Sequence, residues 1–271
     1  MSIDRLRAHY GFSKMPFGKD LAPNMLHGHR AHQEALARIA WCVTERQIGV
    51  ISGECGAGKT VAARAAVSSL DRSRHTILYL GTPGVGLRGL YALIVTGLGG
   101  TPRFHAASLI PQAQELLAAE SEERSKQVVL IIDEAHLLDG ESLEGLRCLS
   151  NADMDQTAPF TLLLLGQPTL RRKLRQGVFA ALDQRIGLRY TIEGLSREET
   201  ASYISHHLTI AGRSDTLFSD DAVGLIHQSS RGLPRLVNNI AVQSLIAAFA
   251  EKKRIVDESS ARTALAEVSA E

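Results

Sequence analysis

The chain has 271 residues, 44% of them apolar and 22% charged, with 23 glycines and 8 prolines. This composition excludes a disordered, collagen-like or coiled-coil architecture and predicts a globular chain with one large domain, or one plus a small appendage. Thirty Lys and Arg residues against 29 Asp and Glu give a net charge of +1, so any site for a polyanion must be local.

Short apolar runs alternate with longer segments of helical period, which is typical of an α/β domain with a parallel sheet. Most runs lack the polar and apolar alternation of a half-exposed strand, as expected where helices cover both faces of a sheet. The runs lie at residues 48–52, 76–80, 128–133, 160–166 and 188–192. They predict five buried parallel strands as the core of the fold.

After residue 192 the strand-like runs stop and helix-start signals follow. Ser196 and Ser219 each precede acidic residues, the pattern of an N-cap, and Pro234 stands where a helix would begin. Gly212 is expected to end the first of these helices. The expected division is a segment 1–45 leading into the core, a nucleotide-binding core 46–193, and a small all-helical lid subdomain 194–271.

Cysteine usage and hydropathy bear on the compartment. Cys42, Cys55 and Cys148 are odd in number and widely spaced, which predicts a reducing compartment and no disulfide framework. The longest apolar runs are far shorter than the ~20 residues that cross a bilayer, and the N-terminus lacks the apolar region of a signal peptide. We therefore expect a cytoplasmic protein with no membrane segment.

A complete G-x-x-x-x-G-K-[ST] motif follows the first predicted strand and precedes a helical stretch. Glycines let the backbone wrap a polyphosphate with its N–H groups pointing inward. Lys59 is expected to reach the β and γ phosphates of ATP, and Thr60 to bind magnesium. The alternative is a glycine-rich turn without a ligand. The expected cofactor-binding residues are Gly53, Glu54, Cys55, Gly56, Ala57, Gly58, Lys59, Thr60 and Val61.

A second motif ends the run 128–133. Asp133 is expected to hold Mg through its water shell, and Glu134 to orient and activate the water that attacks the γ-phosphoryl group, which predicts a hydrolase. The alternative is that the two acids only cap the next helix. With His136 they also spell a helicase tetrapeptide, but such helicases need two tandem nucleotide-site domains, and one core with a helical tail leaves no room for the second.

These motifs, with Gln167, Arg185 and Arg235 at the expected places, resemble those of AAA+ ATPases. The Tyr-Gly-Phe at 10–12 and the segment 32–36 further resemble the general secretion pathway protein A-like ATPases and their transposon-encoded helper relatives. The resemblance covers nearly the whole chain. Secretion members carry a membrane segment and an envelope domain beyond the core, and their absence here favours the transposition helpers.

The resemblance implies roles for three further residues. Gln167 takes the sensor-1 position, where Asn is commoner, and Arg235 the sensor-2 contact with the bound phosphates. Arg185 takes the place of the arginine finger that a subunit offers to its neighbour's nucleotide. The neighbouring arginines that could act in its place are Arg171, Arg172, Arg175 and Arg189. A solvated basic face explains this cluster equally well.

The resulting hypothesis is a Mg-dependent ATPase that forms a homo-oligomeric ring or filament and regulates a partner transposase on duplex DNA. Arg88, in a glycine-rich and mobile loop, and Arg103, in a second turn, are the expected DNA contacts. Two ordinary surface arginines are the alternative. A secretion or envelope-assembly motor without DNA, and a regulatory nucleotide switch, remain alternative functions.

Three histidines, His27, His29 and His32, are spaced like a metal cluster only superficially, because no Cys or carboxylate accompanies them in a ligand pattern. They are expected to flank the adenine pocket.

Overall fold

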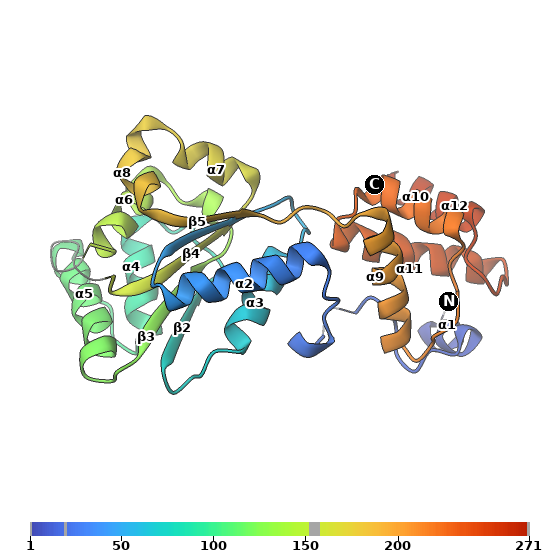
Figure 1. Ribbon diagram of the computed structural model, residues 1–271, viewed down its shortest axis with the longest axis horizontal. Helices are drawn as coiled ribbons and strands as arrows, with labels where there is room; N and C mark the ends of the chain where they lie inside the picture. The colour runs from blue at the N-terminus through green and yellow to red at the C-terminus, as the bar shows by residue number, and fades with distance from the viewer. Residues whose placement is uncertain (1, 19–20, 152–157, 270–271) are drawn as a thin grey trace. The chain divides into compact units, whose positions relative to one another are not determined.

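The apolar runs form a single parallel sheet. In the computed structural model, which describes residues 2–18, 21–151 and 158–269, five strands are ordered β2-β3-β4-β1-β5 (Figure 1). They are β1 (Ile48–Ser52), β2 (His75–Leu80), β3 (Gln127–Ile132), β4 (Phe160–Gly166) and β5 (Ile186–Thr191). All neighbouring strands pair in parallel. The predicted α/β fold with a five-stranded parallel sheet is confirmed.

By its internal contacts the chain divides into two compact units. The sheet unit comprises residues 32–54 and 59–192, and the helical unit comprises residues 1–31, 55–58 and 193–271. The sheet unit also carries α3 (Lys59–Ser68), α4 (Gly86–Gly97), α5 (Ala106–Glu122), η2 (Ala135–Leu137), α6 (Gly140–Leu149), α7 (Pro168–Leu174), η4 (Gly177–Phe179), α8 (Ala180–Arg185) and nearly all of α2 (Arg30–Thr44).

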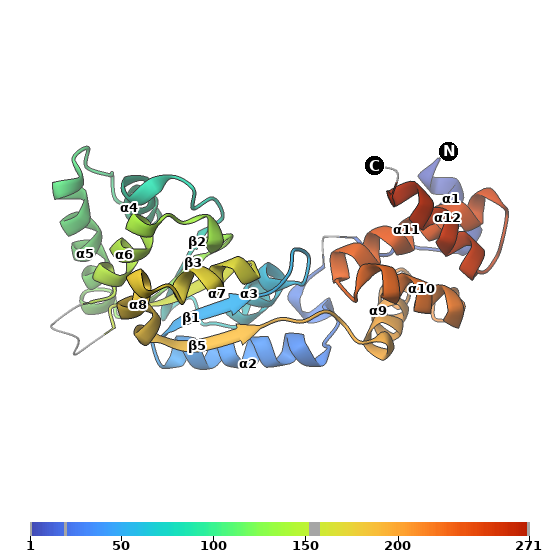
Figure 2. The same cartoon turned by 90° about the horizontal axis from the view of Figure 1, so that it is seen from above.

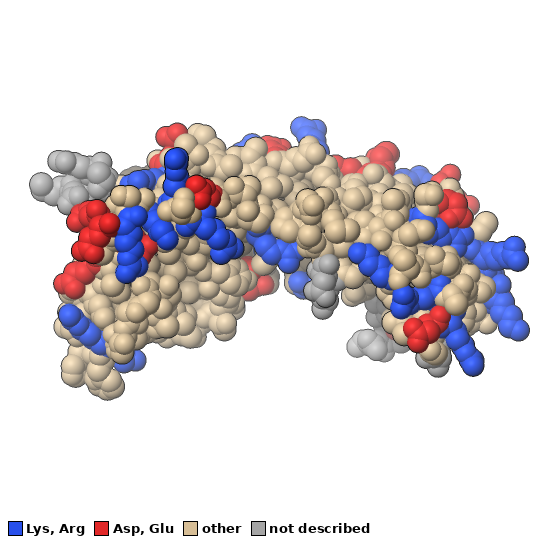
Figure 3. Space-filling view, turned by 90° about the horizontal axis from the view of Figure 1, so that it is seen from below, with Lys and Arg blue, Asp and Glu red and all other residues tan. Residues whose placement is uncertain are grey.

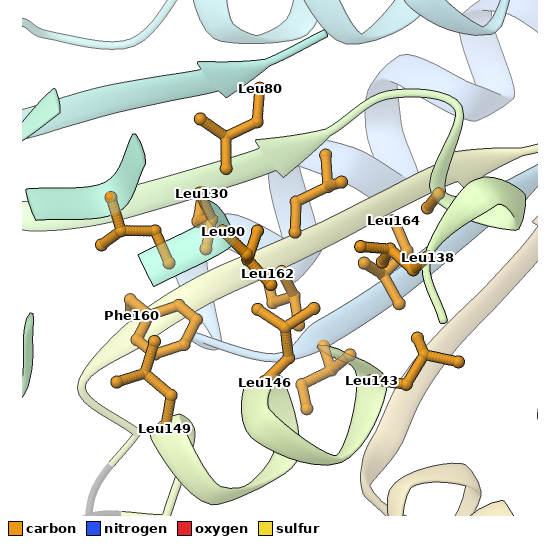
Figure 4. Packing of buried hydrophobic residues seen from close by; sticks show 14 of the residues in the cluster. Leu80, Leu90, Leu130, Leu138, Leu143, Leu146, Leu149, Phe160, Leu162 and Leu164 are labelled. Atoms are coloured by element: carbon orange, nitrogen blue, oxygen red, sulfur yellow. The ribbon is translucent and has the colours of Figure 1, made fainter. Parts of the chain in front are cut away.

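Both faces of the sheet are covered, which explains why its strands read as continuous apolar runs. Side chains of successive residues in a strand point to opposite faces. Leu130, Leu162 and Leu164 pack with Leu90 of α4 and with Leu146 of α6 in one buried cluster (Figure 4). Burying each such leucine stabilises the fold by about 1.5–3 kcal/mol.

The opposite face of the sheet is covered by α2, which runs alongside β1 and β5 (Figure 2). A Cβ atom added at Gly49 of β1 would lie 2.9 Å from the Cys42 sulfur of α2 and 3.0 Å from Leu163 of β4. Glycine at this position therefore lets the helix approach the sheet closely. On β5 the Tyr190 ring lies 4.7 Å from the Arg38 guanidinium of α2.

The helical unit is built around α9 (Arg197–Ile210), α10 (Asp220–Ser230), α11 (Pro234–Ala250) and α12 (Glu258–Ser269), with α1 (Ile3–Tyr10) and η1 (Pro23–Met25) from the N-terminus. Leu6 and Phe12 are buried in the same cluster as Leu208. The Tyr10 hydroxyl donates to the Leu245 carbonyl at 3.1 Å. The segment 6–12 therefore belongs to the core of this unit.

The predicted helix starts in the helical unit are confirmed. The Ser196 hydroxyl accepts from the Glu199 N–H and the Glu199 carboxylate accepts from the Ser196 N–H, a complete capping box. Ser219 caps α10, and Pro234 is the first residue of α11. Each side-chain cap contributes about 1 kcal/mol.

Within the described parts of the chain, every helix is too short or too polar to cross a bilayer.

Candidate nucleotide site

The glycine-rich motif connects β1 to α3 as a strand, a turn and a helix. Gly56 and Gly58 have φ angles of 82° and 97°, in the left-handed region that favours glycine. Gly53 donates its N–H to the Gly166 carbonyl at 3.3 Å, which joins the start of the turn to the end of β4. The motif thus has the backbone conformation that its glycines predict.

Lys59, the first residue of α3, is only 6% exposed. Its ammonium group donates to the carbonyls of Gly53 at 2.9 Å and of Glu54 at 3.0 Å. The cation is therefore held under the turn by neutral acceptors. Phosphate oxygens entering the turn would be stronger acceptors, because they carry negative charge.

Asp133 lies directly after β3 and is 5% exposed. One carboxylate oxygen accepts from the Thr60 hydroxyl at 2.6 Å, and the other accepts from the N–H of Glu134 at 2.8 Å. A hydroxyl and a carboxylate side by side are hard oxygen donors of the kind that Mg²⁺ prefers. The two residues predicted to bind the metal are therefore in direct contact.

Tyr79 of β2 also belongs to this cluster. Its hydroxyl donates to the same Asp133 oxygen as Thr60 does, at 2.9 Å. Desolvation, the hydrogen bond to Asp133 and the charges of Asp133 and Glu134 raise the pKa of Tyr79 to about 12, so the phenol keeps its proton at neutral pH. No motif in the sequence marks this residue. Its only sequence signal is a hydroxyl near the end of a predicted strand. Tyr79 reaches Asp133 because β2 lies next to β3 in the sheet.

Glu134 adopts a left-handed backbone conformation, with φ 50° and ψ 34°. This conformation costs a residue other than glycine about 1–2 kcal/mol and often marks functional sites. Its side chain is 45% exposed, and its Oε2 atom lies 3.3 Å from Nδ1 of His136. His136, interpreted from sequence only through the helicase tetrapeptide, is thus a neighbour of the predicted water-activating residue.

Gln167 follows β4, which pairs with both β1 and β3. Its position at the carboxyl end of the middle strand puts it between the turn after β1 and the turn after β3. A Cβ atom at Gly166 would lie 3.3 Å from the His136 backbone nitrogen, so the end of β4 closely approaches the segment after β3. The half-buried Gln167 is therefore beside the predicted catalytic carboxylate segment.

The predicted finger residue, Arg185, lies at the opposite edge of the sheet. It ends α8 directly before Ile186, which pairs with Ile48, the first residue of β1. The five residues of β1 put ~16 Å between this edge and the glycine-rich turn. Arg185 therefore lies far from the glycine-rich turn of its own chain.

The other arginines differ in their contacts. Arg189 forms an ion pair with Asp183, with Nη2 and Oδ1 2.9 Å apart. Arg171 of α7 donates to the Thr191 hydroxyl at 2.6 Å, and that hydroxyl lies 2.9 Å from the Ser52 hydroxyl at the end of β1. Arg171 is thus at the edge that carries the glycine-rich turn. Arg172 and Arg175 are exposed.

In the helical unit, Arg235 contacts the part of the glycine-rich turn that groups with this unit, residues 55–58. Its N–H donates to the Gly56 carbonyl and its Nη1 to the Cys55 sulfur, both at 3.3 Å. A Cβ atom at Gly56 would lie 2.7 Å from Cβ of Arg235, so glycine is required for this approach. Ala57 is buried beside them, and Val61 follows in α3.

The two predicted DNA-contacting arginines are exposed. The expectation that Arg88 lies in a mobile loop is wrong, because α4 begins at Gly86 and includes Arg88 in its first turn. Its Nε atom donates to the Phe104 carbonyl at 2.9 Å. The N–H of Arg103 donates to the Gln112 side chain at 3.0 Å.

The histidines do not form a metal cluster, and no group of three or more metal-ligating side chains occurs among the residues described. The His27 ring stacks on His29 and contacts Tyr203 and His206 of α9. His32 is buried on α2.

Together the fold and the site define a P-loop nucleotide-binding protein. A protein-family profile described as AAA domain matches residues 43–174. General secretion pathway protein A of Aeromonas hydrophila is 33% identical over 245 residues, which are 89% of this chain and 44% of that protein. The chain therefore spans less than half the length of this curated relative. It belongs to the AAA+ ATPases of the general secretion pathway protein A-like family.

Several solved structures share this fold. Cdc6p of Pyrobaculum aerophilum matches with a TM-score of 0.71 and 18% identity, over 93% of this chain and 70% of that one. The ORC1 protein of Aeropyrum pernix, solved in complex with DNA, gives 0.68 and 14%, over 93% and 68%. The RuvB Holliday junction branch migration motor of Thermotoga maritima gives 0.57 and 19%, over 88% and 68%. At these identities the likeness concerns the fold alone.

Proposed function

We propose that this chain hydrolyses ATP to ADP and phosphate in a magnesium-dependent reaction. The observation that carries the proposal is the convergence of Lys59, Thr60 and Asp133 at the carboxyl ends of β1 and β3, with Glu134 next to them. A cation, a hydroxyl and two carboxylates in this arrangement are what phosphoryl transfer to water requires.

Binding would begin at the glycine-rich turn, where residues 53–61 surround the phosphates. The Lys59 ammonium would exchange its two carbonyl acceptors for phosphate oxygens. Thr60 and Asp133 would hold the magnesium ion, since their oxygens already face each other. The ion neutralises phosphate charge when it is bound.

Glu134 is the proposed general base. Its half-exposed carboxylate would orient the attacking water and accept its proton as the new bond to phosphorus forms. Gln167, after the adjacent strand, would hydrogen-bond the water or the γ-phosphate. Arg235 would stabilise charge on the phosphates, and its contacts with Cys55 and Gly56 support this role.

Turnover would depend on assembly into a homo-oligomer. Arg185 lies at the edge of the sheet away from its own glycine-rich turn, which supports a role at the nucleotide of a neighbouring subunit. A guanidinium supplied in this way stabilises the charge of the transition state. Whether the assembly is a ring or a filament depends on subunit geometry.

For the biological role we propose a cytoplasmic transposition helper that binds duplex DNA and acts with a transposase. The fold-level likeness to ORC1 solved with DNA and the exposed Arg88 and Arg103 support DNA binding. The alternative is an ATPase of secretion or envelope assembly that acts on a protein without DNA. The name of the 33% identical relative, general secretion pathway protein A, favours that alternative.

The test is the ATPase rate of the purified chain with and without duplex DNA. We expect magnesium-dependent turnover that duplex DNA stimulates, and none in Lys59→Ala. Turnover that DNA leaves unchanged, together with no DNA binding at low salt, would favour the secretion-type alternative. Absence of turnover under every condition would contradict the enzymatic proposal.

A further inference from the structure

An aromatic side chain stands exposed at the start of α5. Phe104 is 77% exposed, directly before His105 and α5. Arg88 of α4 holds it in two ways. Its Nε atom donates to the Phe104 carbonyl at 2.9 Å, and its guanidinium carbon lies 5.1 Å from the centre of the ring. We call this pair the Arg88–Phe104 clasp.

The turn that presents the ring is held in place on its other side. The Gln112 side chain accepts from the Arg103 N–H at 3.0 Å and donates to the Thr101 carbonyl at 2.9 Å. The exposure of Phe104 is therefore part of an ordered structure with several hydrogen bonds. The ring is therefore presented in an ordered position from which it can pack on a flat apolar partner.

The segment that carries the clasp is basic. Between the end of β2 and Gln114 the chain has two arginines, Arg88 and Arg103, and no aspartate or glutamate. Acidic and basic side chains both occur on the face shown in Figure 3. Asp139 approaches Gly86 at the start of α4, but its carboxylate accepts from the Ser142 N–H and caps α6. An exposed ring beside Arg88 and Arg103 suits a polyanion with apolar faces better than it suits an acidic protein.

We propose that the Arg88–Phe104 clasp is a nucleobase contact, in which the ring packs on a base while Arg88 and Arg103 lie against the flanking phosphates. This inference rests on the DNA binding in the proposed function and adds a base contact to it. Apolar rings contact bases either as wedges in a deformed duplex or by stacking on unpaired bases. Both binding modes place an apolar ring against a base, so the experiment compares duplex DNA with DNA that has unpaired bases.

The experiment measures affinity of the full chain, with a non-hydrolysable ATP analogue, for a perfect duplex, a duplex with a mismatch bubble and a single strand. Each is titrated across a range of salt concentrations. Stacking releases no counterions, so Phe104→Ala should weaken binding about tenfold at every salt concentration without changing the salt slope. Arg103→Ala should instead reduce the slope by about 1. Phe104→Trp should retain binding.

Val178→Ala is the matched control, because Val178 is 79% exposed on η4, outside this segment. It should bind like the wild type. Wild-type DNA affinity in Phe104→Ala would overturn the clasp proposal and leave the proposed function intact. Loss of assembly and of ATP turnover in Phe104→Ala, measured in the absence of DNA, would also overturn the clasp proposal. The ring would then be a contact between subunits. A wild-type chain that binds none of the DNAs would reject DNA binding itself.

Discussion

The Thr60 hydroxyl and the Asp133 carboxylate are joined by a 2.6 Å hydrogen bond, although 73 residues separate them in the sequence. The bond connects the start of α3 to the end of β3. Because β4 separates β1 from β3 in the sheet, this contact spans the width of three strands. It brings the two sequence motifs into one site, and the predictions below test what each part of the site does.

Lys59 and Glu134 should separate binding from hydrolysis. Lys59→Ala removes the buried cation of the glycine-rich turn, so ATP affinity should fall roughly 10- to 100-fold, since charge-assisted hydrogen bonds are worth about 1.5–3 kcal/mol. Glu134→Gln removes the base but keeps an amide in its place, so ATP should still bind while turnover is lost. Fluorescent-nucleotide titration and phosphate release measure the two properties. Undiminished turnover in Glu134→Gln would remove this residue from its proposed role.

Arg185→Ala should bind ATP almost normally and lose hydrolysis by about 10³-fold or more. The reason is that Arg185 lies ~16 Å from the turn of its own subunit, a distance equal to the length of β1. Mixing Arg185→Ala with Lys59→Ala should restore part of the turnover, because some interfaces then join an intact turn to an intact finger.

Arg171→Ala is the comparison for that experiment. Arg171 lies at the other edge of the sheet, where it donates a hydrogen bond to Thr191. Mixing Arg171→Ala with Lys59→Ala should therefore not restore ATP turnover. If no mixing ratio restores activity for Arg185→Ala, the finger belongs to another arginine.

Tyr79→Phe should reduce ATP turnover roughly tenfold with little change in the fold. The substitution removes a hydrogen bond to the Asp133 carboxylate, and bonds to charged groups contribute about 1.5–3 kcal/mol. Tyr79 is a positioning residue, so the magnesium concentration that gives half-maximal turnover should shift as well.

Tyr91→Phe supplies the control. The Tyr91 hydroxyl donates to the Gly145 carbonyl between α4 and α6, in the buried core. Its loss should lower the free energy of unfolding by about 1 kcal/mol and leave turnover and its magnesium dependence unchanged. Equal effects of the two substitutions on turnover would show that Tyr79 has only a structural role.

The parts of the structure that local patterns determine could be predicted. The strands β1 and β4 have the predicted bounds, because fully buried strands appear as continuous apolar runs. The caps at Ser196 and Ser219 follow from side-chain chemistry within one helical turn. The glycine-rich turn follows from the positive φ angles that its glycines permit.

The parts that depend on distant residues could not be predicted. Tyr79 joins the site only because β2 lies next to β3, and strand order leaves no mark in the sequence of either strand. Tyr10 contacts Leu245 across 235 residues of sequence. The glycines before Arg88 predict a loop at that position, although α4 already begins at Gly86.

The histidine cluster of the helical unit should make its stability depend on pH. His207 is 3% exposed, stacked on Phe17 with ring centres 5.1 Å apart. Burial, and then the charges of His206 and His27, lower the pKa of His207 to about 4. Burial also lowers the pKa of His27 and His29, with Glu199 opposing the shift.

Because the folded pKa of His207 lies below its ordinary value of 6.5, the unfolded chain binds more protons between these two pH values. Stability is therefore complete above about pH 6.5 and falls as the pH drops towards 4, by on the order of 3 kcal/mol from this residue. Urea unfolding at a series of pH values measures the loss. His207→Phe keeps an aromatic ring against Phe17 but cannot titrate, so its stability should vary less than that of the wild type over this range. His105→Phe, at an exposed position, should keep the wild-type dependence. A wild-type profile in His207→Phe would mean that the acid sensitivity arises elsewhere.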